Sequence, residues 1–272
     1  MGSPRSNIAR AMLTPLQQLL AGLSGVIAGM LSGFFGVGGN VVLIPLVSLA
    51  LGLTQHQAQG LTLAALLPPL GLPAVWQYRK AGVPLSWKVV LAAIVGFAVA
   101  IPLGSAAANI VPGNVLRGIF ALLLFATAIR TLRAPKEEVE ADHAEIPPRF
   151  VWPTVLAGFA GGLASGLLGI GGAIVVIPLL RRLLKMSQKQ AQLTSLAMLL
   201  PPIALPGVLV YAQAQEAMPW GALVPIAIGF LGGAFLGARL ARVVSAARLQ
   251  RGFAVVLLVA SASLLFAALR SS

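Results

Sequence analysis

The sequence predicts an all-α, multi-pass membrane protein made of two inverted-topology repeats of about five helical segments each, the first two forming a Gly-broken hairpin. Hydrophobic residues make up 58% of the 272 residues and charged residues only 9%, a balance outside that of soluble domains. Apolar stretches recur from Leu16 to Leu269, and most are long enough to cross a hydrocarbon core of about 30 Å. The second half also repeats the first at a constant shift of 133 positions.

The internal repeat rests on uncommon residue types that keep one register. The shift places Ser32, Gly36, Gly38, Gly39 and Pro45 on Ser165, Gly169, Gly171, Gly172 and Pro178, and Gln59, Pro68, Pro69, Tyr78 and Trp87 on Gln192, Pro201, Pro202, Tyr211 and Trp220. Shared composition would not hold one register over so many such positions. The predicted organisation is an N-terminal extension at 1–15, repeat one at 16–132, a polar linker at 133–149 and repeat two at 150–270.

Each repeat contains five apolar segments. They lie at 16–35, 38–52, 58–78, 87–107 and 114–132 in repeat one, and at 152–168, 171–185, 191–212, 219–239 and 249–269 in repeat two. The first two segments flank "GFFGVGGNVVLIP" at 33–45 and "GLLGIGGAIVVIP" at 166–178. The stretch from Leu16 to Gly52 is too long for one crossing and short for two, so we expect a hairpin of short or partly re-entrant helices.

The third segment of each repeat carries a double proline, which should interrupt its helix within the membrane. The sequence favours a static kink at these prolines, and the alternative is that the released carbonyls coordinate a cation or that the prolines bend a gate. The candidate helix-breaking or gating residues are Pro45, Pro68, Pro69, Pro178, Pro201 and Pro202.

Equivalent loops of the two repeats carry different charges. The loop at 79–88 holds three Lys or Arg residues and its counterpart at 212–219 holds only Glu216, whereas 181–189 holds four and 52–57 none. Positive charge accumulates on the cytoplasmic side, so equivalent loops face opposite sides, as five crossings per repeat require. The linker is then cytoplasmic and both termini are outside, although the N-terminal arginines favour the opposite orientation.

The charged residues also exclude several functions. The net charge of +13 comes from Lys and Arg in short clusters between apolar runs, which indicates topology signals and no nucleic-acid partner. The chain has no cysteine and two histidines, so we expect no metal site, no cofactor and no catalytic residue. All six acidic residues lie in the linker or at a helix end, so no carboxylate relay runs through the membrane.

The glycine clusters predict the substrate site. Four glycines within seven positions should end or bend a helix, and the freed backbone groups must be buried in protein or line a watered cavity. Half-helices that begin at Gly39 and Gly172 would direct N–H groups and the positive ends of two helix dipoles at one site, which suits an oxyanion. Close helix packing is the competing explanation. The candidate substrate-binding residues are Ser32, Gly36, Gly38, Gly39, Asn40, Gln59, Thr62, Ser165, Gly169, Gly171, Gly172, Gln192, Thr194 and Ser195.

The polar residues that follow the hairpin leave two interpretations open. Gln59, Thr62, Gln192, Thr194 and Ser195 begin the third segment and would donate hydrogen bonds to an anion, or they would cap helices and join neighbouring ones. Asn40 has no counterpart amide in repeat two, which favours a single asymmetric site.

The doubled glycine motif with its trailing proline, followed by "HQAQGLTLAALLPP" and "KQAQLTSLAMLLPP", resembles the TauE/SafE family of sulfite-exporter-like permeases from about Leu16 to Leu269, apart from the linker. The resemblance implies a multi-pass transporter of the bacterial or archaeal inner membrane that moves small sulfur-containing anions such as sulfite or organosulfonates. The family's glycine motif falls here on Gly33, Gly36, Gly38, Gly39 and Pro45, and on Gly166, Gly169, Gly171, Gly172 and Pro178.

We therefore expect a secondary transporter that works by alternating access, with the anion at the paired breaks. Its partners are a small anionic substrate and the lipid bilayer, and a homo-oligomer is compatible with the sequence. The alternatives are an anion channel, a transporter of another small organic anion, and a subunit that assembles with a transporter without transporting.

Overall fold

The computed structural model describes residues 13–35, 39–69, 71–133, 151–215, 218–240 and 246–270, and every regular element in them is a helix. The helices are α2 (Pro15–Phe35), α3 (Asn40–Leu51), α4 (Gln55–Ala65), α5 (Leu72–Lys80), α6 (Trp87–Ile110), α7 (Gly113–Arg133), α8 (Val151–Leu168), α9 (Ala173–Leu184), α10 (Gln188–Met198), α11 (Leu205–Ala214), the short 3₁₀ helix η2 (Trp220–Ala222), α12 (Leu223–Leu240) and α13 (Ala246–Arg270). The all-α prediction is confirmed.

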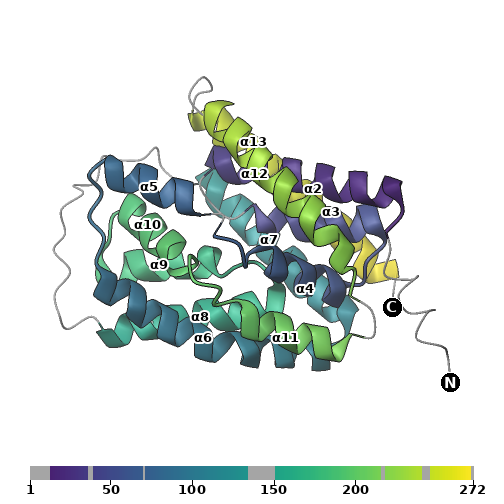
Figure 1. Ribbon diagram of the computed structural model, residues 1–272, viewed down its shortest axis with the longest axis horizontal. Helices are drawn as coiled ribbons and strands as arrows, with labels where there is room; N and C mark the ends of the chain where they lie inside the picture. The colour runs from purple at the N-terminus through teal and green to yellow at the C-terminus, as the bar shows by residue number, and fades with distance from the viewer. Residues whose placement is uncertain are drawn as a thin grey trace.

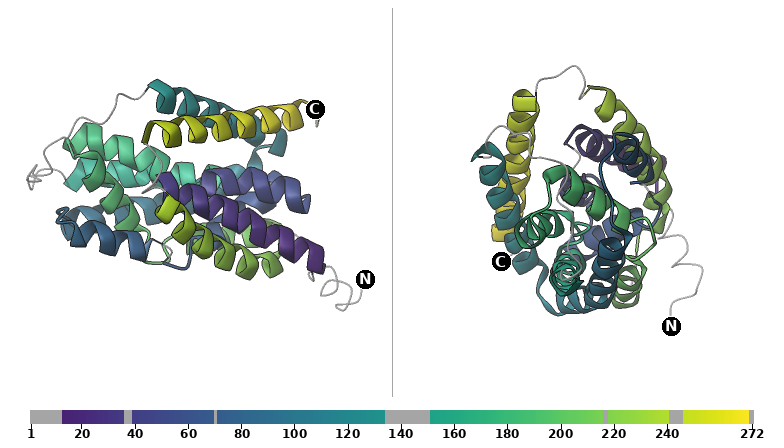
Figure 2. Two further views of the ribbon diagram at one scale, coloured as in Figure 1. Left: turned by 90° about the horizontal axis from the view of Figure 1, so that it is seen from above. Right: turned by 90° about the vertical axis from the view of Figure 1, so that its left-hand side faces the viewer.

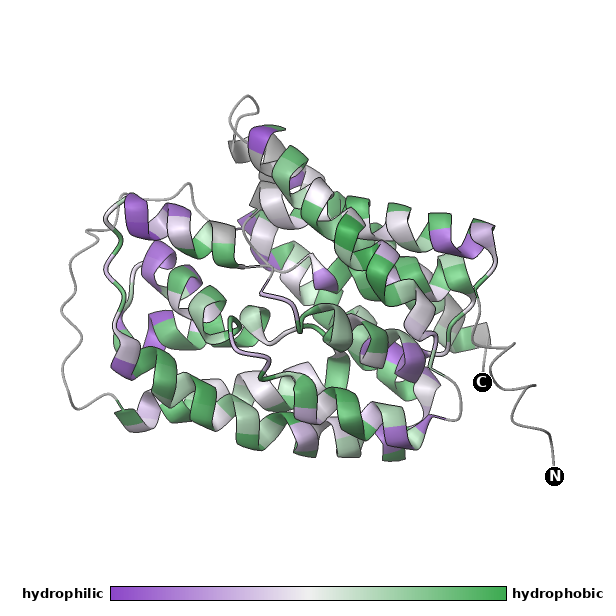
Figure 3. Cartoon of the chain, viewed as in Figure 1, coloured by the Kyte–Doolittle hydropathy of each residue, from purple (hydrophilic) through white to green (hydrophobic). Residues whose placement is uncertain are grey.

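Five stretches of these helices are long and apolar enough to cross a membrane: Pro15–Gly33, Trp87–Ile110, Gly113–Arg133, Val151–Leu168 and Trp220–Gly237. They also expose the large apolar side chains that a lipid-facing surface requires. On α6, Leu91, Val95, Val99 and Leu103 recur at every fourth position and are between 53% and 59% exposed. Figure 3 shows hydrophilic residues mainly toward the helix ends. The surface is therefore suited to a bilayer along most of its length.

The long helices pack in three pairs: α2 against α12, α6 against α8, and α7 against α13. Figure 1 shows α6 and α8 together, and Figure 2 shows α7 and α13 side by side along one flank. Small residues let two of these pairs approach closely. A Cβ at Gly25 would overlap the carbonyl oxygen of Ile226, and a Cβ at Gly158 would overlap that of Ala93. The two contacts are equivalent, because Gly158 lies 133 positions after Gly25 and Ile226 lies 133 positions after Ala93.

The hairpins after α2 and α8 have one long and one short helix. α2 and α8 contain 21 and 18 residues, whereas α3 and α9 contain 12 each, about 18 Å of rise. The expectation that both helices of each hairpin are short is therefore wrong for the first helix. That helix is long because its pairing face is lined by small residues that pack along its whole length.

The third segment of each half consists of two helices. α4 ends at Ala65 and α5 begins at Leu72, so Pro68 and Pro69 lie in the connection, and Pro201 and Pro202 lie likewise between α10 and α11. The predicted interruption of each helix at its double proline is thus confirmed, whereas the continuous segments at 58–78 and 191–212 are wrong because the chain breaks there and does not merely kink. Two successive prolines remove two N–H donors and push the preceding residue out of the helical region, which breaks the helix completely.

Pro45 and Pro178 do not break a helix. Each is the sixth residue of its helix, and α3 and α9 continue to Leu51 and Leu184. Their assignment as helix-breaking residues is therefore wrong. Each proline removes the one N–H that would donate to the carbonyl oxygen four residues before it, and both helices tolerate this loss.

The four short helices that flank the breaks lie on opposite sides of the molecular centre. Figure 1 places α3 and α4, with α11, on one side, and α9 and α10, with α5, on the other. Two apolar clusters pack around them, one centred on α6, α9 and α10 and the other on α3, α7 and α13. The chain breaks at Gly39 and at Gly169–Gly172 lie between these halves.

Candidate transport site

The break between α8 and α9 requires glycine for its backbone conformation. Gly169, Gly171 and Gly172 have φ angles of 74°, 73° and 71°, in the left-handed region that side chains disfavour. Gly172 also lacks room for a side chain, because a Cβ there would lie 2.7 Å from Cε2 of Phe97 and 2.8 Å from the carbonyl oxygen of Gly161. The segment ends α8 sharply and positions Gly172 as the N-cap of α9.

The break before α3 uses its glycine differently. Gly39 is the N-cap of α3 with a helical φ of −53°. A Cβ there would overlap the carbonyl oxygen of Ala28 and lie 2.8 Å from Cβ of Ser32, which is half-buried beside it. Gly39 therefore serves close approach to α2. The other two predicted glycines of this motif, Gly36 and Gly38, lie outside the described residues.

The first glycine of each motif is a packing residue. A Cβ at Gly33 would overlap the carbonyl oxygen of Ala234 on α12, and a Cβ at Gly166 would overlap that of Ile101 on α6. The competing explanation of the glycines as packing devices thus holds for these two positions and for Gly39, but it does not account for the left-handed residues before α9.

The beginnings of α3 and α9 meet. Asn40, the first residue of α3, is 4% exposed, and its Nδ2 atom lies 3.5 Å from the position that a Cβ of Gly171 would occupy. Gly171 stands two residues before α9 begins. The two helices extend to opposite sides of the centre (Figure 1), so their N-terminal ends, which carry the positive ends of the two helix dipoles, converge. This arrangement favours an anion.

Two tyrosines, which the sequence analysis did not select, hold the predicted glutamines. The buried Tyr211 hydroxyl on α11 lies 2.7 Å from the Gly166 carbonyl oxygen and 3.1 Å from Oε1 of Gln59. On α5, the Tyr78 hydroxyl donates to Oε1 of Gln192 at 2.8 Å. Each bond joins a tyrosine of one half to a glutamine of the other, and the two bonds are related by the 133-residue shift. The matched tyrosines in the repeat were the available signal.

Thr62 braces the break between α8 and α9. Its Oγ1 lies 2.9 Å from the carbonyl oxygens of Ala58 and Gln59 and 3.2 Å from that of Gly169. A hydroxyl has one proton, and these three carbonyls compete for it, so Thr62 positions α4 against the break. In the other half Thr194 and Ser195 are buried on α10, and Ser195 is the counterpart of Thr62.

Several buried polar side-chain atoms lack a hydrogen-bond partner within the described part of the chain. They include both amide atoms of Gln55 at the start of α4, and also Nε2 of Gln59 and the hydroxyl oxygens of Ser105, Ser165 and Ser195. Gln59 and Ser165 flank the bonds that Tyr211 makes, because Gly166 follows Ser165 directly. Ser105 on α6 was not predicted, and its Oγ lies 2.9 Å from where a Cβ of Gly207 would be. A buried donor without a partner costs about 1–3 kcal/mol, so these groups are suited to a polar ligand or water.

The helix-cap interpretation applies to other residues. Thr54 and Gln57 form a capping box at the start of α4, and Ser187 and Gln190 form one at the start of α10. Gln59, Thr62 and Gln192 lie further along these helices and are not caps. The end of α4 reaches the break, since Cδ1 of Leu66 lies 2.9 Å from the position of a Gly171 Cβ. The Pro68–Pro69 connection therefore starts beside the site.

The donors around the breaks are hydroxyls, amides and helix N-termini. Within the described ranges, no group of three or more His, Asp or Glu side chains lies close enough to hold a metal ion. His56 is engaged elsewhere, since its Nε2 lies 2.9 Å from the carbonyl oxygen of Ala108 and 3.2 Å from that of Val111 at the end of α6.

Comparison with known proteins agrees with the transmembrane architecture. Residues 20–264 match the family described as "Sulfite exporter TauE/SafE". A "Probable membrane transporter protein" of Xylella fastidiosa strain Temecula1 is 28% identical over 239 residues, which cover 86% of this chain and 90% of that protein. "Probable membrane transporter protein YdhB" of Bacillus subtilis is 26% identical over 242 residues, which cover 88% and 96%.

An archaeal relative extends the comparison. "Probable membrane transporter protein MJ0441" of Methanocaldococcus jannaschii is 26% identical over 197 residues, which cover 70% of this chain and 71% of that protein. The matched family region covers all described helices except the ends of α2 and α13. The family is one of transporters and not of enzymes. The chain belongs to the TauE/SafE sulfite exporter family of multi-pass membrane transporters.

Proposed function

We propose that this protein is a secondary transporter that moves small sulfur-containing anions, such as sulfite or organosulfonates, across the cell membrane by alternating access. The family description supports the substrate class. The convergence of the α3 and α9 N-terminal ends at Asn40 and Gly171 is the observation that carries the proposal, because two positive dipole ends favour a small oxyanion. The buried donors of Gln59 and Ser165 would complete its coordination.

The two halves act in this proposal as inverted-topology repeats. Contacts between equivalent pairs of residues support this, since the glycine contacts of α2 with α12 recur between α8 and α6, and the Tyr211–Gln59 bond recurs as Tyr78–Gln192. Inverted repeats allow one half to open toward each side in turn around a fixed central site.

The charge distribution orients the protein. We call the end at which α5 and α9 end the basic end, defined by Lys80, Lys88, Arg182 and Lys185; α5 and α9 lie on the left of Figure 1. At the opposite end, where Thr54 and Val111 lie, the loop at 52–57 contains no Lys or Arg. The positive-inside rule then places the basic end in the cytoplasm.

The chain's charges also restrict the driving force. All six acidic residues lie at 137–145 or at Glu216, outside the spanning helices, so a carboxylate relay is not available. Either the substrate carries the proton as a weakly acidic oxyanion, or the membrane potential drives export at about 2.3 kcal/mol per charge per 100 mV.

Flux measurements test the proposal. Purified protein in liposomes should show saturable uptake and counterflow of labelled sulfite or an organosulfonate, with dependence on the pH gradient or the potential. Replacing Asn40 with Ala should raise the KM, whereas Asn114→Ala should not, because the half-buried Asn114 lies at the start of α7, where its Oδ1 accepts a hydrogen bond from the Val115 N–H. Flux that does not saturate and shows no counterflow would indicate an anion channel, and flux indifferent to both gradients would refute a coupled transporter.

A further inference from the structure

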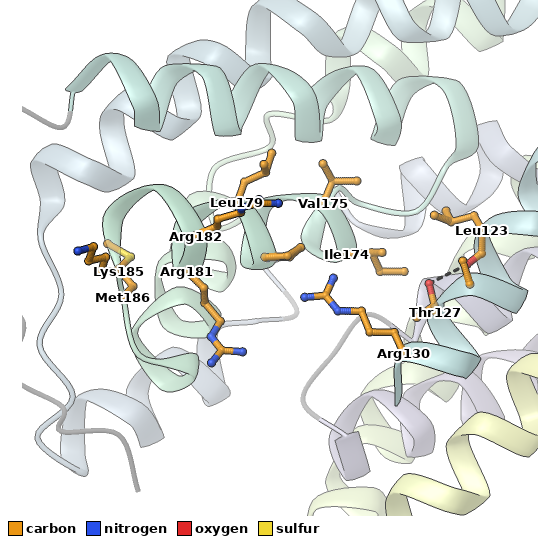
Figure 4. A pocket seen from close by; sticks show the side chains of 12 residues that line it. Leu123, Thr127, Arg130, Ile174, Val175, Leu179, Arg181, Arg182, Lys185 and Met186 are labelled. Carbon is orange, nitrogen blue, oxygen red and sulfur yellow. Dashed lines mark hydrogen bonds between the residues drawn. The ribbon is translucent and has the colours of Figure 1, made fainter. Parts of the chain in front are cut away.

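A pocket of about 840 Å³ separates α7 from α9. Its lining combines a basic part with an apolar part, and none of the lining residues is acidic. The lining residues used below are Thr127, Arg130, Ile174, Val175, Arg181 and Lys185. Figure 4 shows the guanidinium groups of Arg130 on α7 and Arg181 on α9 extending into the space between the two helices.

The pocket connects the basic end with the region of the glycine break. Lys185 follows the last residue of α9 at the basic end, whereas Ile174 and Val175 are the second and third residues of α9, directly after the Gly169–Gly172 segment. The pocket therefore extends along α9 from the cationic rim to the residues that directly follow the glycine break.

The equivalent position in the other half is closed and uncharged. The counterparts of Ile174 and Val175 are Val41 and Val42, which are 1% and 3% exposed and belong to an apolar cluster with residues of α13. α13 packs directly against α3, whereas Ile174 and Val175 remain half-exposed beside the pocket.

The cations of the pocket have neutral counterparts. The positions equivalent to Arg130 and Arg181 are Ser263 and Ser48, whose hydroxyls donate to carbonyl oxygens of Ala260 and Leu53 within their own segments. The two halves therefore differ at this position in sequence as well as in packing. Anions are attracted to only one of the two equivalent positions.

We propose that the α7–α9 pocket is the open, cytoplasm-facing entrance of the transporter, in which Arg130 and Arg181 select and concentrate free oxyanions before they reach the breaks. This inference rests on the proposed function for its route, but the pocket's charge selectivity is a separate property. The α7–α13 pair is the movable wall: it packs on α3 in this conformation, and packing on α9 instead would close the pocket and open the opposite side.

Because the sequence contains no cysteine, an introduced cysteine supplies the one thiol that a thiol-specific reagent can modify. Val175→Cys and Val42→Cys introduce single thiols at equivalent positions. Anionic and cationic methanethiosulfonate reagents are then compared in liposomes, with rates normalised to Ala81→Cys, an exposed position at the basic end. We expect Val175→Cys to react about tenfold faster with the anionic reagent than with the cationic one, because the local field concentrates anions, and Val42→Cys to react slowly with both.

Charge variants test whether Arg130 and Arg181 cause the preference for the anionic reagent. Arg130→Ser with Arg181→Ser should bring the reagent ratio at Val175→Cys close to one and raise the KM for anion uptake from the basic end, while Arg130→Lys with Arg181→Lys should preserve the ratio. The control is Arg79→Ser with Lys88→Ser, which removes the same charge from exposed positions at the same end outside the pocket. An unchanged ratio in the first pair, or an equal fall in the control, would overturn the assignment.

Anionic lipid headgroups present the same oxygen chemistry as free oxyanions, and the liposome composition distinguishes the two. A free-anion entrance predicts that sulfate protects Val175→Cys equally in phosphatidylcholine and in phosphatidylglycerol liposomes. Blocked labelling confined to phosphatidylglycerol would assign the pocket to lipid and overturn the entrance. If labelling stays charge-selective while no sulfur anion is transported, the proposed function fails and the pocket assignment is retained.

Discussion

At the scale of single residues, the two tyrosine–glutamine hydrogen bonds that connect the halves can be tested by substitution. Tyr211 is fully buried, and two acceptors, Oε1 of Gln59 and the carbonyl oxygen of Gly166, compete for the single proton of its hydroxyl. Tyr78 is half-buried where it donates to Gln192. The same pair of residue types therefore occurs in two environments of different burial within one protein.

We expect Tyr211→Phe to destabilise the protein by about 2 kcal/mol, because it removes the one proton that the buried Gln59 amide oxygen and Gly166 carbonyl oxygen share. Tyr78→Phe should cost less, since water can replace the lost donor at a half-buried site. Thermal unfolding of both variants in the same detergent measures the difference. Equal losses would show that the Tyr211 bonds carry no special weight.

The left-handed glycines give a second residue-scale prediction. Gly172→Ala meets both a positive φ and two close atoms, whereas Gly52→Ala meets a φ of 66° with no atom within 4 Å. Backbone strain alone costs about 1–2 kcal/mol, and overpacking adds about 1–3 kcal/mol. Gly172→Ala should therefore lower the unfolding temperature more than Gly52→Ala, and an equal effect would mean that the segment before α9 relaxes freely.

At the scale of elements, close helix pairing decides where the long helices lie. Gly232 and Gly233 are neighbours on α12, and a Cβ at each would point in a different direction. A Cβ at Gly233 would overlap the carbonyl oxygen of Val26 on α2, whereas nothing lies within 4 Å of one at Gly232.

Gly233→Ala should destabilise the α2–α12 pair by about 2 kcal/mol, because it forces two backbones apart. Gly232→Ala should be neutral or stabilise slightly, since Ala is the better helix former by up to about 1 kcal/mol. The yield of folded protein and thermal unfolding in detergent report the contrast. If both variants lost stability to the same extent, α12 would be shown to tolerate no substitution at either glycine.

The helix breaks could be predicted from local sequence better than the roles of the residues around them. Double prolines and clustered glycines act within a few residues, so the ends of α4 and α10 and the starts of α3 and α9 follow from them. Pro45 and Pro178 led to a wrong prediction because a single proline removes one hydrogen bond, a loss that the remainder of each helix tolerates. Tyr211 and Ser105 were missed because the residues that surround them, Gln59 and Gly207, lie on helices remote in sequence.

At the scale of the whole molecule, the proposed orientation places the basic end in the cytoplasm. Ala81 is exposed at that end and Ala214 is exposed at the end of α11, on the opposite side in Figure 1. Both alanines can be replaced with Cys in a chain that has no other thiol.

A membrane-impermeant maleimide applied to intact cells should label Ala214→Cys and should label Ala81→Cys only after the membrane is opened, because the positive-inside rule keeps the Lys and Arg clusters in the cytoplasm. The reverse pattern would invert the topology. It would also transfer the α7–α9 entrance to the outside and leave its anion selectivity unchanged.

The sequence by itself determined that the chain is a helical membrane protein of this transporter family, where its helices break, and which residues recur at a 133-residue interval. These properties follow from hydropathy, glycine and proline, whose effects are local. Only the tertiary structure decided that Tyr211 binds Gln59, that Gly33 and Gly166 pack helices, and that a basic pocket is open beside α9 while its counterpart beside α3 is closed. These features depend on how surfaces on helices distant in sequence meet, and hydropathy leaves that arrangement undetermined because every long helix is apolar.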